Sequence, residues 1–187
     1  MIGESLTGGF ADAAPDAARA FRACLDAMAR PGTIQDVAGP QPPAPLGIAA
    51  GIVALTLCDP ETGVWLAPSV DTGAVREWLA FHTGARLAGP AHADFHFGTW
   101  AEMPWDTAKI GTPDYPDRSA TFVIETPLSD AGATIAGPGI KETASIALPD
   151  TAILEANAKR FPLGIDLILT DGARLAAMPR TTRAQEG

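Results

Sequence analysis

The feature that most constrains the fold lies near the C-terminus. Residues 161–170 form an almost continuous apolar run, FPLGIDLILT, and the dipeptide Asp171-Gly172 follows it. That dipeptide permits the positive φ angles of a tight hairpin turn. The segment therefore predicts two paired strands from about Ile165 to Met178. They end in Pro179 and a basic, hydroxyl-bearing tip at residues 180–182.

The rest of the chain alternates between helical and strand patterns. Helices are predicted from Asp16 to Met28, from Leu46 to Cys58, from Asp71 or Thr72 to Thr83, and from Asp150 to Lys159. Strands are predicted at 64–67, 93–97, 121–126 and 133–136, and a capping box predicts a short helix from Thr99. This order predicts an α/β fold in which helices flank a mixed β-sheet and a β-hairpin closes the chain.

Length and composition predict one domain that spans residues 1–187, with a flexible leader at 1–15 and a flexible tail at 181–187. The net charge of −9 argues against nucleic-acid binding, which needs clustered basic residues. No apolar run reaches the roughly 18 residues of a membrane span, and no signal peptide is recognised, so we expect no membrane partner and a cytoplasmic location. Cys24 and Cys58 have no metal-binding spacing and are expected to be buried, reduced thiols.

Three polar patterns allow a functional and a simpler interpretation. His92, Asp94 and His96 alternate on a predicted strand, where they could bind a metal or simply face water. The turn Gly137-Pro138-Gly139 lacks the spacing of a phosphate loop and is interpreted as a tight turn, with a glycine turn beside a ligand as the alternative. His82 ends a predicted helix, where a positive imidazole suits the helix dipole; the alternative, a catalytic role, would need a nucleophile or a carboxylate nearby.

The tip formed by Arg180, Thr181 and Thr182 is the most attractive polar cluster. A guanidinium with two hydroxyl groups can hold a phosphate or a phosphonate through charged hydrogen bonds. The alternative is a polar strand end followed by a disordered tail. No nucleophile elbow, distinct carboxylate pair or marked lysine accompanies the tip, so the residues alone assign no catalytic group.

Several short motifs together carry a resemblance to a known family. In chain order they are FR at 21–22, MARPG at 28–32, LTLCD at 55–59, WL at 65–66, FHTG at 81–84, GPGI at 137–140, the run at 161–170 and PRTT at 179–182. In their order and spacing they resemble the PhnH subunits of the bacterial carbon–phosphorus lyase system, over nearly the whole chain.

The resemblance implies a subunit of the machinery that degrades organophosphonates. That machinery attaches an alkylphosphonate to C1 of the ribose of ATP with loss of adenine, and a radical iron–sulfur subunit later breaks the carbon–phosphorus bond. The chain lacks the cysteine run of that second subunit. The resemblance further implies a fold similar to pyridoxal-phosphate-dependent transferases without the cofactor, a homodimer in isolation, and the partners PhnG, PhnI and PhnJ. No cofactor or metal is expected.

Two hypotheses about the molecular role follow. In the first, the chain is a noncatalytic subunit whose surface supports a partner's active site. In the second, it has its own phosphonate or nucleotide pocket at the dimer interface. The candidate ligand-binding residues for that pocket are Arg30, His82, Arg180, Thr181 and Thr182.

Overall fold

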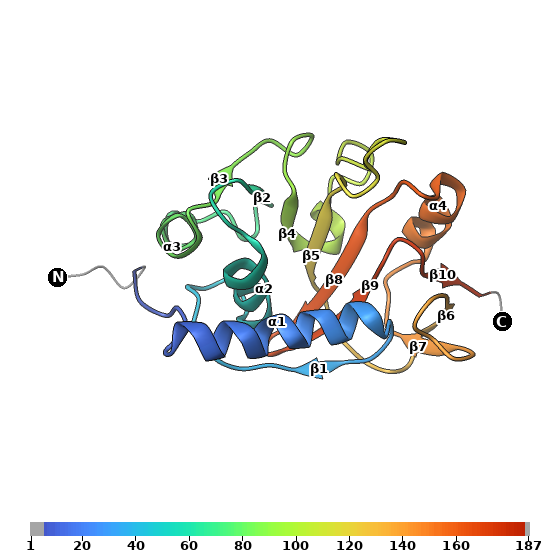
Figure 1. The fold of residues 1–187 in the computed structure, drawn as a ribbon, viewed down its shortest axis with the longest axis horizontal. Coiled ribbons are helices and arrows are strands. Elements are labelled where there is room, and N and C mark those ends of the chain that lie inside the picture. Colours follow the sequence, from blue (N-terminus) through green and yellow to red (C-terminus); the bar gives the residue numbers. More distant parts are fainter. Residues whose placement is uncertain (1–5, 186–187) are drawn as a thin grey trace.

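A mixed β-sheet forms the centre of the protein, whose computed structural model describes residues 6–185 (Figure 1). The sheet has seven strands in the order β1 (Gln35–Asp36), β9 (Arg174–Met178), β8 (Asp166–Asp171), β5 (Thr121–Glu125), β4 (Phe95–Thr99), β2 (Gly63–Leu66) and β3 (Arg86–Leu87). The strands from β8 to β3 run parallel, whereas β9 is antiparallel to both β8 and β1. The predicted α/β architecture with a mixed sheet is confirmed.

A smaller sheet uses part of the segment that was expected to be a flexible tail. Its order is β10 (Arg183–Ala184), β6 (Ala133–Ala136) and β7 (Ala144–Ile146), all antiparallel. Arg183 pairs with Ala136, and the preceding Thr182 is buried. The tail is therefore ordered through residue 185 by main-chain pairing that its own sequence does not reveal; residues 186–187 lie outside the described part.

The N-terminal leader also makes defined contacts where it is described. The Trp78 indole donates a hydrogen bond to the Thr7 carbonyl oxygen (3.1 Å), and the Gln41 amide donates one to the Gly8 carbonyl oxygen (2.8 Å). Thr7, Gly8 and the partly buried Phe10 thus lie against the folded domain, although the sequence predicts flexibility through residue 15. The prediction for residues 1–5 falls outside the described residues.

In the described part of the chain, four α-helices surround the sheet: α1 (Ala13–Ala29), α2 (Ile48–Leu57), α3 (Gly73–Thr83) and α4 (Ala152–Arg160). Helix α3 begins and ends as predicted, because the Thr72 hydroxyl accepts a hydrogen bond from the Val75 amide and Gly84 adopts a left-handed conformation (φ +69°). Helix α1 begins three residues before the predicted cap. Asp16 therefore lies in its first turn and accepts a hydrogen bond from the Asp12 amide.

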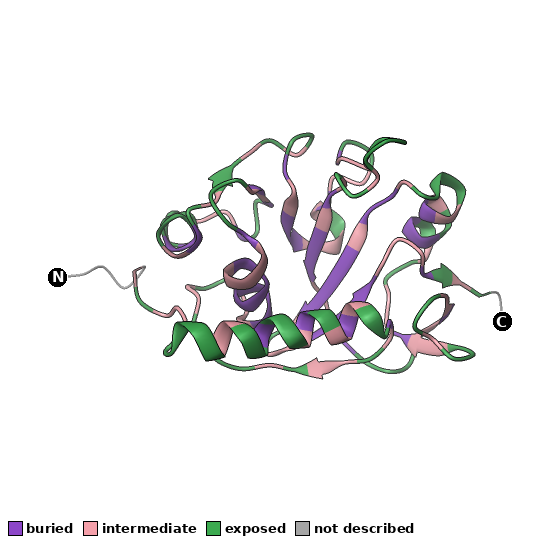
Figure 2. Cartoon of the chain, viewed as in Figure 1, coloured by how far each residue is buried: buried purple, intermediate pink, exposed green. Residues whose placement is uncertain are grey.

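The two faces of the sheet carry different side chains. Register partners His96, Phe122 and Leu167 share one face, because strand residues alternate between faces and partners in register point the same way. Helices α1 and α2 cover part of the other face, and Figure 2 shows α1 with an exposed outer surface beside buried strands. The largest buried side chains include Trp78, Phe97 and Phe122.

The hairpin of β8 and β9 turns one residue later than predicted. Asp171 pairs with Arg174, so the two turn residues are Gly172 and Ala173 rather than Asp171 and Gly172. Gly172 has φ +60°, which suits the first position of a type II′ turn. Asp171 is retained in the strand because its carboxylate accepts a hydrogen bond from the Leu128 amide (3.1 Å) and pairs with Arg174.

The prediction that His92, Asp94 and His96 all face water is wrong for His96. Its ring is fully buried between Trp65 and Phe122, with ring centroids 5.6 and 4.7 Å away. Its Nε2 lies 2.9 Å from the Pro90 carbonyl oxygen, so this nitrogen carries the proton. Asp94 instead accepts a hydrogen bond from the Gly63 amide and pairs with Lys109. Among residues 6–185, no three His, Cys, Asp or Glu side chains gather as a metal site would require.

A buried asparagine gives the first prediction. The Asn157 side chain on α4 donates to the Ile165 carbonyl oxygen (2.8 Å) and accepts from the Ile165 amide (3.0 Å). Asn157→Ala leaves both backbone groups buried and unpaired, and we expect it to lower the free energy of unfolding by about 3 kcal/mol. Urea denaturation measures this loss. The exposed Glu155→Ala on the same helix is the control, and equal stability of the two variants would contradict the prediction.

The buried imidazole gives a pH-dependent prediction. Burial lowers the pKa of His96 below its ordinary value, although the Pro90 carbonyl oxygen opposes the shift. As pH falls through the unfolded-state pKa of about 6.5, the unfolded chain binds the proton first, so the stability of the folded state decreases. We expect His96→Phe to lack this decrease, in denaturation curves recorded between pH 7.5 and 5.5. The exposed His92→Gln should retain it, and identical pH slopes for wild type and His96→Phe would refute the assignment.

Candidate functional site

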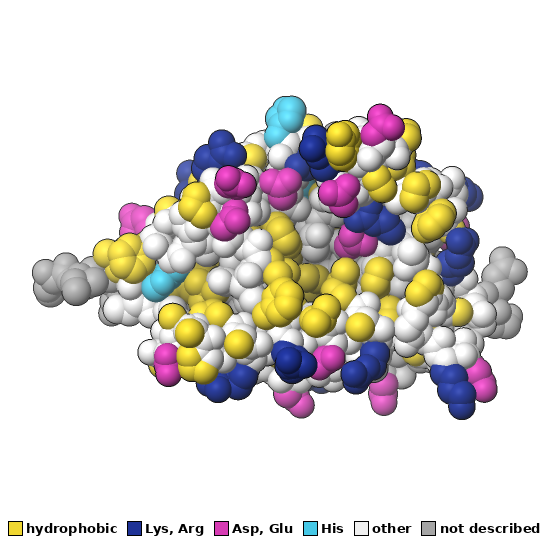
Figure 3. Space-filling model, in the orientation of Figure 1, with side chains coloured by type: hydrophobic (Ala, Val, Ile, Leu, Met, Phe, Trp, Pro, Cys, Tyr) yellow, Lys and Arg dark blue, Asp and Glu magenta, His cyan; other side chains and the backbone are white. Residues whose placement is uncertain are grey.

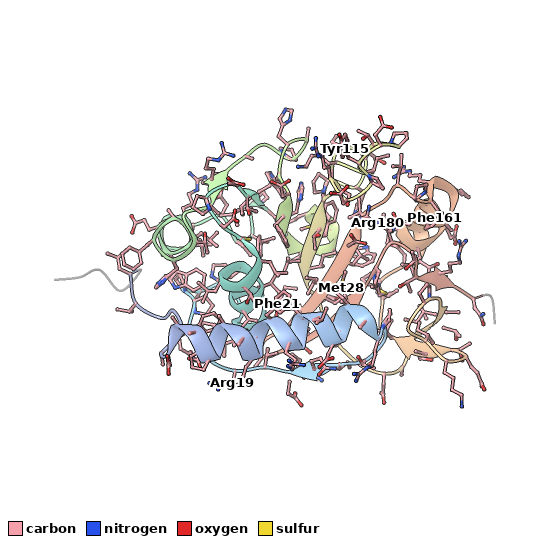
Figure 4. The ribbon with its side chains drawn as sticks, viewed as in Figure 1. Arg19, Phe21, Met28, Tyr115, Phe161 and Arg180 are labelled. Atoms are coloured by element: carbon pink, nitrogen blue, oxygen red, sulfur yellow. The ribbon has the colours of Figure 1, made fainter. Side chains whose placement is uncertain are left out.

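Arg180, the leading candidate from the sequence, lies at the open end of the hairpin. It follows β9 through Pro179, beside Asp166 at the start of β8 (Figure 4). The Arg180 amide donates to Asp166 Oδ1 (2.7 Å), Nε donates to the same oxygen (3.2 Å), and Nη2 pairs with Asp166 Oδ2. Both side chains are only 15% exposed. The pair joins the two strands where no turn connects them.

The remaining donors of Arg180 hold a loop that is distant in sequence. Nη1 donates to the Pro116 carbonyl oxygen and Nη2 also donates to the Ser119 hydroxyl. We call Arg180, Asp166, Pro116 and Ser119 the Arg180 cluster. Every nitrogen of the guanidinium therefore has a protein partner, and a phosphonate would have to displace a buried carboxylate. This geometry favours a structural role for Arg180 over anion binding.

The other residues of the tip are placed by tight main-chain packing. The Thr182 amide donates to the Pro179 carbonyl oxygen (2.8 Å), and its buried hydroxyl has no hydrogen-bond partner within residues 6–185. A Cβ atom on Gly137 would lie 3.0 Å from the Thr181 carbonyl oxygen, and one on Gly139 would lie 2.1 Å from that of Ala29. The turn at 137–140 thus packs between the tip and the end of α1.

Arg30 and His82 do not form a site with Arg180. Arg30 is exposed just after α1, where its guanidinium lies 3.4 Å from Asp26. His82 lies on α3, which Figure 1 shows at the opposite end of the molecule from α4 and β10. Its ring packs against Trp78 and Phe81, with centroids 5.1 and 4.9 Å away. The structure brings the 180–182 tip near the end of α1 but leaves His82 apart.

An apolar groove opens between α1 and the uncovered part of the sheet. It has a volume of about 160 Å³, and its lining is almost wholly apolar: Phe21, Cys24, Leu25, Met28, Leu57, Phe95, Thr121 and Ile168. Figure 3 shows hydrophobic side chains gathered in the middle of this face, and Figure 4 places Phe21 and Met28 on α1 beside it. We call these residues the α1 groove.

The α1 groove is the surface that sequence reasoning missed. Helical spacing placed Phe21, Leu25 and Met28 on one apolar face, as a core helix would have. The structure buries Ala20, Cys24 and Ala27 instead, and leaves Phe21 50% and Leu25 52% exposed. The sequence does contain a pattern that could have indicated this arrangement, a row of small residues at positions 20, 24 and 27. These small side chains let the helix pack closely on the sheet, and the large side chains lie on the adjacent face of the helix.

Neither cysteine has the properties of a nucleophile. Both are buried free thiols, as the sequence predicts. Burial raises the pKa of the Cys24 thiol to about 11 and that of Cys58 to about 12. Thiols with such values are protonated near neutral pH and act as small apolar side chains. Within residues 6–185, no helix has the length and apolar character needed to span a bilayer.

Comparisons with known proteins place this chain among proteins of bacterial phosphonate metabolism. Residues 8–185 match the family described as "Bacterial phosphonate metabolism protein (PhnH)". The chain therefore belongs to the PhnH family.

Two relatives are similar to this chain over most of its length. The chain is 43% identical over 192 residues to the "Alpha-D-ribose 1-methylphosphonate 5-triphosphate synthase subunit PhnH" of Rhizobium meliloti (strain 1021), a match that covers 96% of this chain and 95% of the relative. It is 27% identical over 178 residues to the "Putative C-P lyase subunit protein HtxG" of Stutzerimonas stutzeri, covering 90% of this chain and 86% of the relative. The similarity thus extends over almost all of each protein.

The structural role of Arg180 can be tested by a double-mutant cycle. Arg180→Gln leaves Asp166 buried without its cation, and we expect it to lower the free energy of unfolding by about 2–3 kcal/mol. Adding Asp166→Asn should recover part of this loss, because the uncompensated charge is then removed. Urea denaturation measures each corner of the cycle, with the exposed Arg183→Gln as control. If Arg180→Gln had the same free energy of unfolding as wild type, the structural role would be refuted and the Arg180 side chain would be free for another role.

Proposed function

We propose that this chain is a subunit of a carbon–phosphorus lyase assembly that acts in organophosphonate catabolism. Family membership and the near full-length similarity to a ribose 1-methylphosphonate 5-triphosphate synthase subunit support the proposal. In the reaction concerned, an alkylphosphonate oxygen replaces adenine at C1 of the ribose of ATP, so a C–O bond forms as the C–N bond breaks. The carbon–phosphorus bond is cleaved in a later step.

The chain's role in this assembly is structural: it binds another subunit and supports that subunit's active site. The observation that carries this proposal is the α1 groove, where large apolar side chains are half exposed on a helix that is otherwise well packed. Contiguous exposed apolar surface of this kind is typical of protein interaction sites. The Arg180 guanidinium, which could have held an anion at the sequence-predicted tip, is committed to Asp166, Pro116 and Ser119 in the Arg180 cluster.

The second hypothesis, a phosphonate or nucleotide pocket at the tip, is not favoured by this geometry. Arg180 would bind an anion only after losing Asp166, and Thr182 is buried beneath the neighbouring turn. Arg30 has a largely free guanidinium but no neighbouring candidate beyond the Asp26 carboxylate, which would repel an anion. We therefore propose that Arg180 and Thr182 stabilise the fold and do not bind a ligand.

We further propose that the fold is similar to that of pyridoxal-phosphate-dependent transferases but is used without the cofactor. A Schiff base needs a lysine whose amino group is free and directed into a pocket. Lys109 is paired with Asp94, and Lys141 and Lys159 are exposed. None of these residues fits the cofactor. The homodimer, the partners PhnG, PhnI and PhnJ, and the cytoplasmic location stay predictions.

The subunit contact can be tested by placing a charge in the α1 groove. We expect Leu25→Glu to reduce recovery of the complex at least tenfold when this chain is co-expressed with PhnG, PhnI and PhnJ, because a desolvated anion opposes burial at an interface. Affinity purification followed by quantification of each subunit measures the effect. Ala18→Glu adds the same charge to an exposed position of α1 and should leave recovery unchanged.

Thermal denaturation of the isolated Leu25→Glu protein separates binding from folding. Leu25 is half exposed, so the free energy of unfolding of the variant should remain within about 1 kcal/mol of that of wild type. Normal complex recovery from a folded Leu25→Glu variant would refute the proposed contact. Loss of recovery with both glutamate variants would point to a general effect of charge on α1 and would likewise refute it.

A further inference from the structure

A second cavity lies on the face of the sheet opposite the α1 groove. It has a volume of about 240 Å³ and opens between the segment that follows β4 and one side of α4. Trp100 and Trp105 form one wall, and Ile153 and Ala156 of α4 form the other. Asp106, Asp150 and Arg160 complete its rim. We call this cavity the indole pocket.

The aromatic wall of the indole pocket is held in a fixed position. The Trp100 indole donates to Asp150 Oδ2 (3.0 Å), and the Trp105 indole donates to the Trp100 carbonyl oxygen (3.3 Å). The two rings lie 4.9 Å apart at an angle of 51°, and Trp105 rests on the buried Phe122, 5.1 Å away. Because both indole N–H groups are already used, the ring faces are what the wall can offer to a ligand.

Two opposite charges on the rim have no partner among the residues that the structure describes. Neither the Asp106 carboxylate nor the Arg160 guanidinium makes a hydrogen bond or ion pair within residues 6–185. Asp150, in contrast, accepts from both Trp100 and the Ala152 amide. The pocket therefore combines rigid indole faces with one free anion and one free cation.

We propose that the indole pocket binds a small zwitterion, in which an ammonium group and an oxyanion are separated by a short alkyl chain. The ammonium would lie against the indole faces and Asp106, since cations are attracted to the face of Trp and to carboxylates. The oxyanion would pair with Arg160, whose planar guanidinium suits phosphonate and carboxylate oxygens.

Charge and size both favour this class over a nucleotide. The rim carries two carboxylates and one guanidinium, a net charge of −1 that opposes a polyanionic triphosphate. The volume lies below the roughly 300–1,000 Å³ of pockets that hold drug-sized ligands. This site goes beyond the proposed assembly role, and it shares none of its lining residues with the α1 groove.

The proposal is tested by calorimetric titration of the isolated full chain with four small probes, and with ATP as a polyanionic comparison. We expect 2-aminoethylphosphonate or β-alanine to bind more tightly than ethylphosphonate, which lacks the ammonium, and ethanolamine, which lacks the oxyanion. The stronger of the two zwitterions identifies the oxyanion as a phosphonate or a carboxylate. Quenching of tryptophan fluorescence should accompany binding, because two of the four tryptophans line the pocket.

Two charge-neutralising variants locate the ligand. Arg160→Gln should weaken the zwitterion at least fivefold and leave ethanolamine unchanged, whereas Asp106→Asn should weaken both. Lys159→Gln and Glu155→Gln alter exposed neighbours on α4 outside the pocket and should bind as wild type does.

Three results would overturn the proposal: no saturable binding of any probe at millimolar concentration, tighter binding of ATP or ethylphosphonate than of both zwitterions, or wild-type affinity in both Arg160→Gln and Asp106→Asn. Complex recovery is a separate measurement, so failure of the pocket and failure of the assembly role are distinguished.

Discussion

The ion pair between Asp166 and Arg180 is the interaction on which the C-terminal half of the fold depends. It joins the start of β8 to the end of β9, while its guanidinium also holds Pro116 and Ser119 just before β5. The segment before β5, the start of β8 and the end of β9 are therefore fixed together at one end of these strands. Because burying either charge alone is costly, the pair makes this arrangement specific: a conformation that separates the partners leaves an uncompensated charge.

The ion pair between Asp166 and Arg180 also changes the functional interpretation of the tip at residues 180–182. An arginine beside two threonines at a strand end has the composition of an anion-binding site. The same sequence is equally consistent with an arginine that pairs with a buried carboxylate of the fold. The partner decides between the two, and Asp166 lies fourteen residues earlier while Ser119 lies sixty-one residues earlier. No local pattern around Arg180 contains that information. The groups left free for binding are elsewhere, in the half-exposed residues of α1 and on the rim of the indole pocket.

The sequence correctly predicted the ends of those elements that are determined by neighbouring residues in the chain. Thr72 and Gly84 bound α3 because a hydroxyl cap and a left-handed glycine act within one helical turn. The Glu102 carboxylate accepts from the Thr99 amide, as in a capping box, and also from the Thr99 hydroxyl. The misplaced features depend on tertiary partners. Asp171 stays in β8 because of Arg174 and Leu128, and the tail becomes a strand because β6 offers an unpaired edge.

The two proposed surfaces of this protein arise from the alternation of side chains along the same strands. On β5, Thr121 lines the α1 groove, whereas the next residue, Phe122, supports Trp105 in the wall of the indole pocket. A slip of one residue in the pairing of β5 would exchange these faces. The parallel pairing of β5 with β4 and β8 over five residues each, together with the cluster that holds Ser119 and Asp166, fixes this register. Arg180, which looked like part of a binding tip, thus helps to determine which side chains each face of the sheet presents.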